Sequence, residues 1–374
     1  MIRESATFWE VVFDLSLWLA IYASLKPVLK APYTIPNRNQ RWAYVFILLF
    51  CLFPFFGGDY FHYILNYDAA KSGGYAHIED IYVWFIENWC TSYHMFRLGV
   101  WGTALLVLFT SYKYISNNIG LVLFFFGVLY LPWFSYARVS LAMALIFCGL
   151  CLCVKPINKL KKISFLFGLS IMLTSIAFHR SAFIGIVCAL GSLFFGKPNR
   201  KTIIIFSILF PLAIFVLTYA LGQFMSLDLG YDDLISSRLR DDYLLDENTG
   251  GLAMGIGPFI MVFLTRAPMF IVAFAYIYYA FKGYFTDFTY SERIISSYSF
   301  LVILLALVFC FDLGFNTYSL YYRTLTFSHI PSAIFLSKIY LSGRSPRLYK
   351  WIYIPTIIGV LYTLVYSAYC TFFR

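Results

Sequence analysis

Five arginines lie at the ends of strongly apolar segments, apart from the basic loops of the chain: Arg97, Arg138, Arg180, Arg266 and Arg323. A guanidinium inside a membrane segment is costly, so it faces a bundle interior or a wet cavity and has an anionic partner. That partner is either a carboxylate of the chain, such as Asp59, Asp68 or Asp312, or a phosphorylated ligand. Arginine binds phosphate and diphosphate through paired hydrogen bonds and keeps its charge. The arginines therefore predict either structural ion pairs or a diphosphate site.

Two further residues are candidates for moving a proton. His179 stands beside Arg180 in the turn FHRS, and an ordinary histidine titrates at about pH 6.5, which suits a proton acceptor. Asp59 follows two glycines in FFGGDYFHY, where the backbone can turn tightly and approach a ligand closely. The structural alternatives are an interfacial histidine and a plain exit turn from the membrane. Three nearby tyrosines are candidates for positioning a sugar: Tyr60, Tyr136 and Tyr322.

Two acids, Glu10 and Asp14, lie four residues apart within the first apolar segment. A helix places residues at this spacing on one face. The pair predicts either a proton or cation pathway or, as we favour, ion pairing with an arginine of a neighbouring helix.

The whole chain has the composition of a membrane protein. It is 61% hydrophobic and 12% charged over 374 residues, whereas an average soluble domain has about 25% charged residues. A bilayer core of roughly 30 Å needs about 20 apolar residues per helix, and continuous apolar runs favour helices over a barrel. We expect an all-α transmembrane bundle forming a single domain over 1–374. The predicted spans are 8–25, 42–56, 95–112, 119–136, 139–154, 163–178, 181–195, 202–224, 255–281, 294–311, 320–340 and 351–369.

The basic residues predict the orientation of these twelve spans. Alternate loops hold 18 of the 28 Lys and Arg residues but only the acids Asp287 and Glu292. Cytoplasmic loops retain Lys and Arg, so these loops face the cytoplasm and both termini face outward. Two longer stretches, 57–94 and 225–254, then lie outside as candidate lids over an outward site. Within the first, 78–89 has the pattern of an amphipathic interfacial helix.

Other chemistries find no support in the sequence. The cysteines fall mainly in apolar runs and lack the spacing of a zinc site. No nucleotide-binding loop, dinucleotide fingerprint, nucleophile elbow or HExxH motif occurs, so we expect no cofactor and no metal. No basic arm or interleaved aromatic and basic pattern indicates nucleic acid. The basic loops are expected to contact anionic membrane lipids.

Several of these motifs also resemble a known family. The segments PWFSYARVSLAMALIFCGLCLCV (132–154) and SIAFHRSAFIGIVCAL (175–190) resemble the arginine-containing helix and the phenylalanine-histidine turn of Wzy-type O-antigen polymerases, particularly the EpsG-like branch. GGDYFHY (57–63) and YYRTLTF (321–327) fit the same pattern in the same order. The resemblance runs from about residue 55 to residue 335.

This resemblance implies a metal-independent, GT-C-like glycosyltransferase of the bacterial cytoplasmic (inner) membrane. Such an enzyme joins oligosaccharide repeat units carried on undecaprenyl diphosphate at the periplasmic face, making O-antigen, capsule or exopolysaccharide. Its partners are the lipid-linked donor and acceptor, together with a flippase and a chain-length regulator. The resemblance marks Arg138, His179 and Arg323 as functional residues, and Asp59 with them. Arg266 is added from the charge argument alone.

Two other functions fit the same features. A ligase would move the glycan from undecaprenyl diphosphate to a different acceptor. A transporter or flippase of lipid-linked oligosaccharide is less consistent with the sequence, because such proteins often show internal repeats and charges at the membrane midplane.

Overall fold

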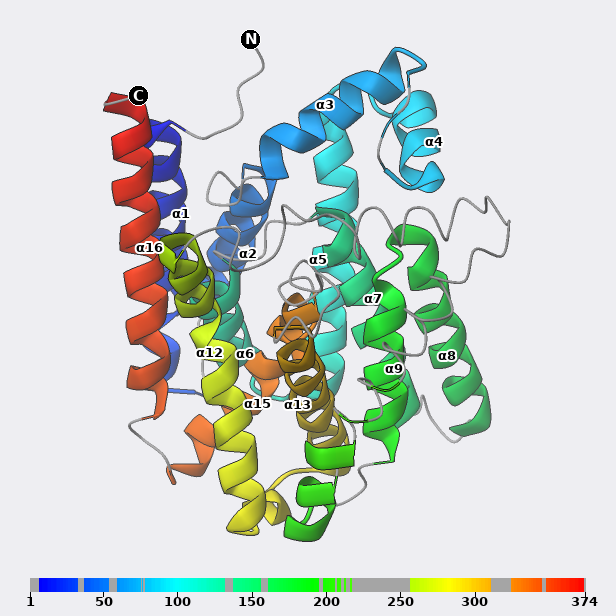
Figure 1. Ribbon diagram of the computed structural model, residues 1–374, viewed down its shortest axis with the longest axis vertical. Coiled ribbons are helices and arrows are strands. Elements are labelled where there is room, and N and C mark those ends of the chain that lie inside the picture. Colours follow the sequence, from blue (N-terminus) through cyan, green and yellow to red (C-terminus); the bar gives the residue numbers. More distant parts are fainter. Residues whose placement is uncertain are drawn as a thin grey trace.

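The computed structural model shows a bundle of helices in which the first helix begins and the last helix ends at the same end of the bundle (Figure 1). The structure describes residues 7–32, 37–53, 59–74, 76, 78–131, 137–155, 161–194, 198–205, 207–209, 212, 216, 256–310, 324–344 and 348–372. Within these ranges all regular elements are helical and none is a strand. The predicted all-α class is therefore confirmed for the part of the chain that the structure describes.

The helices follow the hydropathy of the sequence closely. They are α1 (Phe8–Leu25), η1 (Lys26–Leu29), α2 (Asn37–Leu52), α3 (Asp59–Lys71), α4 (Asp80–Trp89), α5 (Tyr93–Ile115), α6 (Ile119–Phe125), η2 (Phe126–Tyr130), α7 (Ala137–Val154), α8 (Lys161–Phe178), α9 (Ala182–Leu193), α12 (Ile256–Phe281), η5 (Tyr284–Asp287), α13 (Tyr290–Cys310), α15 (His329–Ser342) and α16 (Leu348–Phe372). A helix overlaps each predicted span whose residues the structure describes. Most of the span over 202–224 lies outside the described residues, although 202–205 and 207–209 are helical. The predicted loop over 225–254 lies outside them entirely. Among the described residues, four helical segments are long and apolar enough to cross a membrane, so a helical membrane protein is supported and a count of twelve spans remains a prediction.

The helices differ in how much of their surface faces other helices. In the most apolar window of α8 only 22% of the residues are buried, against 72% in α13. Large apolar side chains of α8 lie exposed on the outside of the bundle, with 63% of Leu166 and 59% of Leu173 accessible. α8 therefore belongs to the lipid-facing rim, and α13 to the middle of the bundle.

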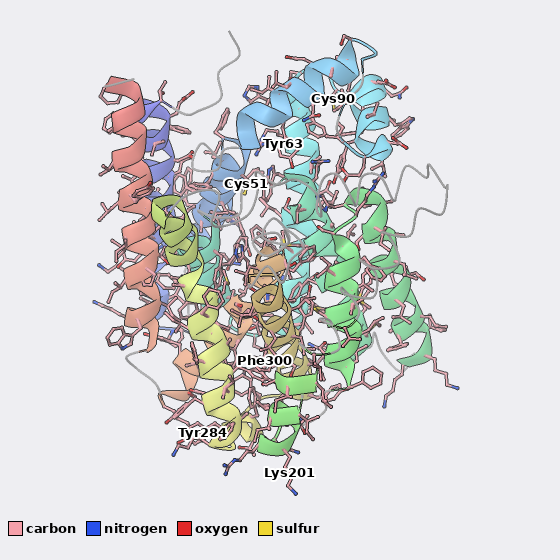
Figure 2. The ribbon with its side chains drawn as sticks, viewed as in Figure 1. Cys51, Tyr63, Cys90, Lys201, Tyr284 and Phe300 are labelled. Atoms are coloured by element: carbon pink, nitrogen blue, oxygen red, sulfur yellow. The ribbon has the colours of Figure 1, made fainter. Side chains whose placement is uncertain are left out.

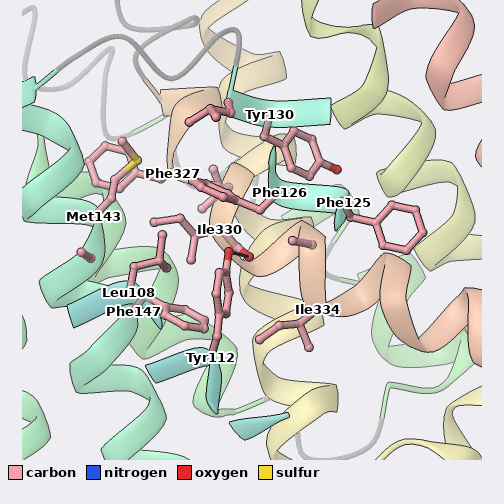
Figure 3. Close-up of a cluster of buried hydrophobic side chains, with 14 of the residues drawn as sticks. Leu108, Tyr112, Phe125, Phe126, Tyr130, Met143, Phe147, Phe327, Ile330 and Ile334 are labelled. Atoms are coloured by element: carbon pink, nitrogen blue, oxygen red, sulfur yellow. Dashed lines mark hydrogen bonds between the residues drawn. The ribbon is translucent and has the colours of Figure 1, made fainter. Parts of the chain in front are cut away.

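Short buried helices fill the centre of the bundle. α6, η2 and most of α15 are buried on all sides. Figure 3 shows the packing between them, where the Tyr112 hydroxyl donates a 2.8 Å hydrogen bond to the carbonyl oxygen of Ile330. The rings of Tyr130 and His329 stack with centroids 5.3 Å apart. η2 is a π-helical segment, a rare conformation that the apolar pattern did not predict.

Within the described part of the chain, α7 and α8 approach each other closely. A Cβ atom added to Gly149 of α7 would collide with the carbonyl oxygen of Gly168, and one added to Gly168 would lie 2.5 Å from the carbonyl oxygen of Gly149. Small residues allow such close backbone approach between helices in membranes. Since the two helices run antiparallel, the start of α7 and the end of α8 are held at the same end of the bundle.

The charge distribution separates the two ends of the bundle. Figure 2 shows Lys201 and Tyr284 at one end and Tyr63 and Cys90 at the other. The acids Asp287 and Glu292 of the basic end both form ion pairs. Arg344 lies 2.7 Å from Asp287, and Lys338 lies 2.9 Å from Glu292. α3 and α4 cover the opposite end, where α1 begins and α16 ends (Figure 1). That this end faces outward remains a prediction.

Replacing Gly149 or Gly168 by alanine should destabilise the protein by about 1–3 kcal/mol, because the added methyl group forces the α7 and α8 backbones apart. Thermal unfolding of the purified protein in detergent measures this. Gly102→Ala in α5 is the matched control, since nothing lies within 4 Å of its added Cβ and alanine favours helix by up to about 1 kcal/mol. Equal stability of all three variants would contradict the close contact.

Candidate functional site

Arg138 occupies the first turn of α7, at the end of the bundle covered by α3 and α4. Its Nη1 lies 2.8 Å from Glu79 Oε2, and its Nε donates a 3.2 Å hydrogen bond to the hydroxyl of Tyr63. The guanidinium carbon also lies 5.2 Å from the Tyr63 ring centroid, within cation–π range. The side chains of Arg138 and Glu79 are 17% and 16% exposed, so the pair lies near the surface of the bundle end.

A helix N-terminus is an unusual position for a cation. The unpaired N–H groups of the first turn already give this end of α7 a partial positive charge. Arg138 adds a guanidinium charge at the same point, which the Glu79 carboxylate balances in this structure.

Tyr82 connects Arg138 to the neighbouring turn. Its hydroxyl donates a 3.3 Å hydrogen bond to the backbone oxygen of Arg138, and its ring meets Phe178, the last residue of α8, edge-on at 6.1 Å. Burial raises the pKa of Tyr82 well above its usual value, and the nearby charge of Glu79 acts in the same direction. The hydroxyl therefore remains protonated and stays a donor.

His179 follows Phe178 directly in the turn between α8 and α9. Its ring is buried, at 7% exposure for the residue. Nδ1 lies 3.2 Å from the backbone nitrogen of Ser181 and 2.6 Å from its hydroxyl oxygen. Because a backbone N–H can only donate, Nδ1 accepts here and the neutral ring carries its proton on Nε2. Arg180 is exposed at the same turn. The structure thus brings Arg138, His179 and Arg180 to one end of the bundle.

Arg97 has a different environment. It is fully buried in α5, where Nε donates to the carbonyl oxygen of Leu52 at 3.0 Å and Nη2 to that of Cys51 at 2.6 Å. These carbonyls belong to the last turn of α2, whose partial negative charge favours a cation. The Cys51 side chain lies within the electrostatic influence of both Arg97 and Asp14. These contacts give Arg97 a structural function, that of joining α5 to the end of α2, and a substrate contact of Arg97 remains a prediction.

The remaining predicted site residues are described only in part or not at all. Asp59 and Tyr60 form the first residues of α3, and Arg266 lies within α12, but their side chains lie outside the described part of the structure. Tyr136, Tyr322 and Arg323 lie outside the described residues altogether. Their predicted roles stay predictions. Glu10 caps α1 by exchanging hydrogen bonds with Thr7, which is a local structural role.

Sequence reasoning missed two residues around Arg138, namely Glu79 and Tyr82, whereas Tyr63 belongs to the GGDYFHY motif that the sequence singled out. The carboxylates expected to pair with the arginines included Asp68, which lies exposed on α3. Glu79 immediately precedes α4 as its N-cap residue but makes no side-chain cap hydrogen bond, because its carboxylate is bound to Arg138. A glutamate at the start of a predicted amphipathic helix was the available signal. No group of three or more potential metal ligands occurs among the described residues.

The fold and the site together define a polytopic helical membrane protein in which Arg138, paired with Glu79, and the turn of His179 and Arg180 lie at one end. The EpsG family matches residues 41–373, so the chain belongs to the EpsG family. This is a family of exopolysaccharide and O-antigen polymerase-like proteins, which indicates a glycosyltransferase-like polymerase. No curated protein and no solved structure matches the chain.

His179→Gln should retain part of the polymer synthesis that His179→Asn abolishes. Glutamine places an N–H donor near the position of Nε2, whereas asparagine reproduces only the position of Nδ1, and the site geometry assigns the proton to Nε2. Gel analysis of the polysaccharide chain length in a strain lacking the native copy measures the difference. Equal loss in both variants would instead support a base that no amide can replace.

Proposed function

We propose that this protein polymerises oligosaccharide repeat units linked to undecaprenyl diphosphate at the outer face of the bacterial cytoplasmic membrane. The observation that carries the proposal is the position of Arg138. It stands at the N-terminus of α7, beside the turn of His179 and Arg180, at the end opposite the basic loops. Family membership supports the reaction class, and the arginines at this end support a diphosphate as the group that binds there. We place the bundle in the GT-C-like group of glycosyltransferases.

The reaction joins two lipid-linked sugars. A hydroxyl of the incoming unit attacks the anomeric carbon of the growing glycan, and a new glycosidic bond forms as the bond from that carbon to the diphosphate oxygen breaks. Undecaprenyl diphosphate leaves with the electron pair, and a base takes the hydroxyl proton. The leaving group is already stable as an anion, so it needs no acid.

The cationic residues of the site are proposed to stabilise the leaving diphosphate. Negative charge grows on the diphosphate as the bond breaks, and fixed cations at that point stabilise the transition state more than the ground state. Arg138 and the N-terminus of α7 supply such charge, with Arg180 nearby and with Arg266 and Arg323 as further candidates. Arg138 keeps its charge across the physiological pH range.

The base is proposed from two candidates. A ring whose Nδ1 accepts from the Ser181 amide presents Nε2–H, which donates a hydrogen bond rather than accepting a proton. His179 in this tautomer suits contact with a phosphate or sugar oxygen. Asp59, at the start of α3, then becomes the favoured base.

Arg138→Ala should remove long-chain polysaccharide while leaving normal amounts of protein in the membrane. Losing one fixed charge from such a site lowers turnover by about 100- to 1,000-fold. Arg138→Lys should restore only part of this activity, because the lysine ammonium cannot form the paired hydrogen bonds of a planar guanidinium. Purified protein with synthetic undecaprenyl-diphosphate repeat units gives the direct assay.

Lys113→Ala is the matched control for charge removal, since Lys113 is exposed at the basic end of the bundle and should have no effect. Full-length polymer from Arg138→Ala would overturn the assignment of the site. Polymer that is made but left unattached to the cell surface would indicate the ligase reaction instead.

The outward orientation of the site has its own test. Cysteine introduced as Asn88→Cys on α4 should react with a membrane-impermeant maleimide in intact cells, in a background without native cysteines. Lys162→Cys on α8 should react only after the cells are broken. Both positions are exposed in the structure, so the reverse labelling pattern would place the site at the cytoplasmic face.

A further inference from the structure

Arg138 is held by side chains from two elements that are distant in sequence. Tyr63 of α3 contacts the guanidinium through its hydroxyl, at 3.2 Å from Nε, and through its ring, at 5.2 Å. Glu79, at the start of α4, binds Nη1 at 2.8 Å. Tyr82 holds the backbone of the same residue through its carbonyl oxygen. The position and the plane of the guanidinium are thus both determined.

We propose that Glu79 and Tyr63 are positioning residues that orient the Arg138 guanidinium toward the diphosphate of the substrate. This inference rests on the proposed function. Arginine has a long and flexible side chain, and ordering it when the substrate binds would cost conformational entropy. A carboxylate on one nitrogen and a hydroxyl on another fix the fork in advance, and preorganised charge is the kind that lowers a barrier.

The stability of α4 does not require this ion pair. Tyr82 and Ile86 are buried on the inner face of α4, and Phe85 packs so closely on Gly99 of α5 that an added Cβ would lie 2.6 Å from its ring. Tyr82 also meets the rings of Phe96 and Phe178. Apolar packing therefore docks α4.

An ion pair removed from water often adds little net stability, because desolvation offsets the attraction between the charges. The pair of Glu79 and Arg138 is mostly buried, and α4, which Glu79 precedes, is already held by apolar packing. Its main effect is then on the geometry of the guanidinium. If Glu79 instead blocked Arg138 until the substrate displaced it, replacing Glu79 would raise the turnover rate.

The test compares turnover by purified full-length protein with a synthetic undecaprenyl-diphosphate repeat unit. Glu79→Gln should lower kcat by about 10- to 100-fold, which is the usual loss when a residue that orients a functional side chain is replaced. The change in KM should be smaller. Glu79→Asp, which keeps the charge, should recover part of kcat. Tyr63→Phe keeps the ring and loses only the hydroxyl, so it should lower kcat less than Glu79→Gln.

Each variant has a matched control on α3 or α4. Glu87→Gln changes an exposed glutamate of α4, and Tyr67→Phe changes another buried tyrosine of α3. Both should turn over substrate at the normal rate. Thermal unfolding of every variant identifies loss of structure, and Tyr63→Phe carries the test if Glu79→Gln fails to fold.

The inference is overturned if Glu79→Gln and Tyr63→Phe turn over substrate at or above the normal rate while Arg138→Ala is inactive. A faster Glu79→Gln enzyme would identify Glu79 as a competitor for Arg138. If Arg138→Ala is itself fully active, the proposed site fails, and the inference fails with it. The two failures are therefore distinguishable.

Discussion

The site depends on the close backbone contact between α7 and α8. Gly149 and Gly168 face each other with no room for a Cβ atom on either, so the two helices cannot separate or slide without losing their packing. Arg138 begins α7 and His179 follows α8. The contact between these glycines thus sets the relative position of α7 and α8, and with it the relative position of the two polar residues at the helix ends.

The rest of the site comes from the segment that precedes α5. α3 and α4 lie over the bundle end and bring Tyr63, Glu79 and Tyr82 to one residue of α7 (Figure 1). The bundle therefore supplies the charge, and the covering helices supply its orientation. This division resembles that of many enzymes, in which a rigid scaffold carries the reacting groups and a connecting segment completes them.

The positions of the helices were predictable because lipid imposes a simple requirement on the chain. Backbone groups must pair within each span and side chains must be apolar, so α1, α8 and α12 begin or end close to the predicted residues. Which group each arginine would bind was not predictable. Arg97 and Arg138 looked alike in sequence, yet one binds backbone carbonyls and the other a carboxylate, since helix rotation and crossing angle decide which group each one meets.

The exposed face of α8 has a consequence for how such sequences diverge. A residue that meets only lipid tails needs to be apolar and nothing more, so exchanges among Leu, Ile and Phe at positions such as Leu166 and Leu173 are nearly neutral. Over long times these positions lose any trace of common ancestry. The glycines at the contact of α7 and α8 have no room for any larger residue, so such positions are constrained where the lipid-facing ones are not.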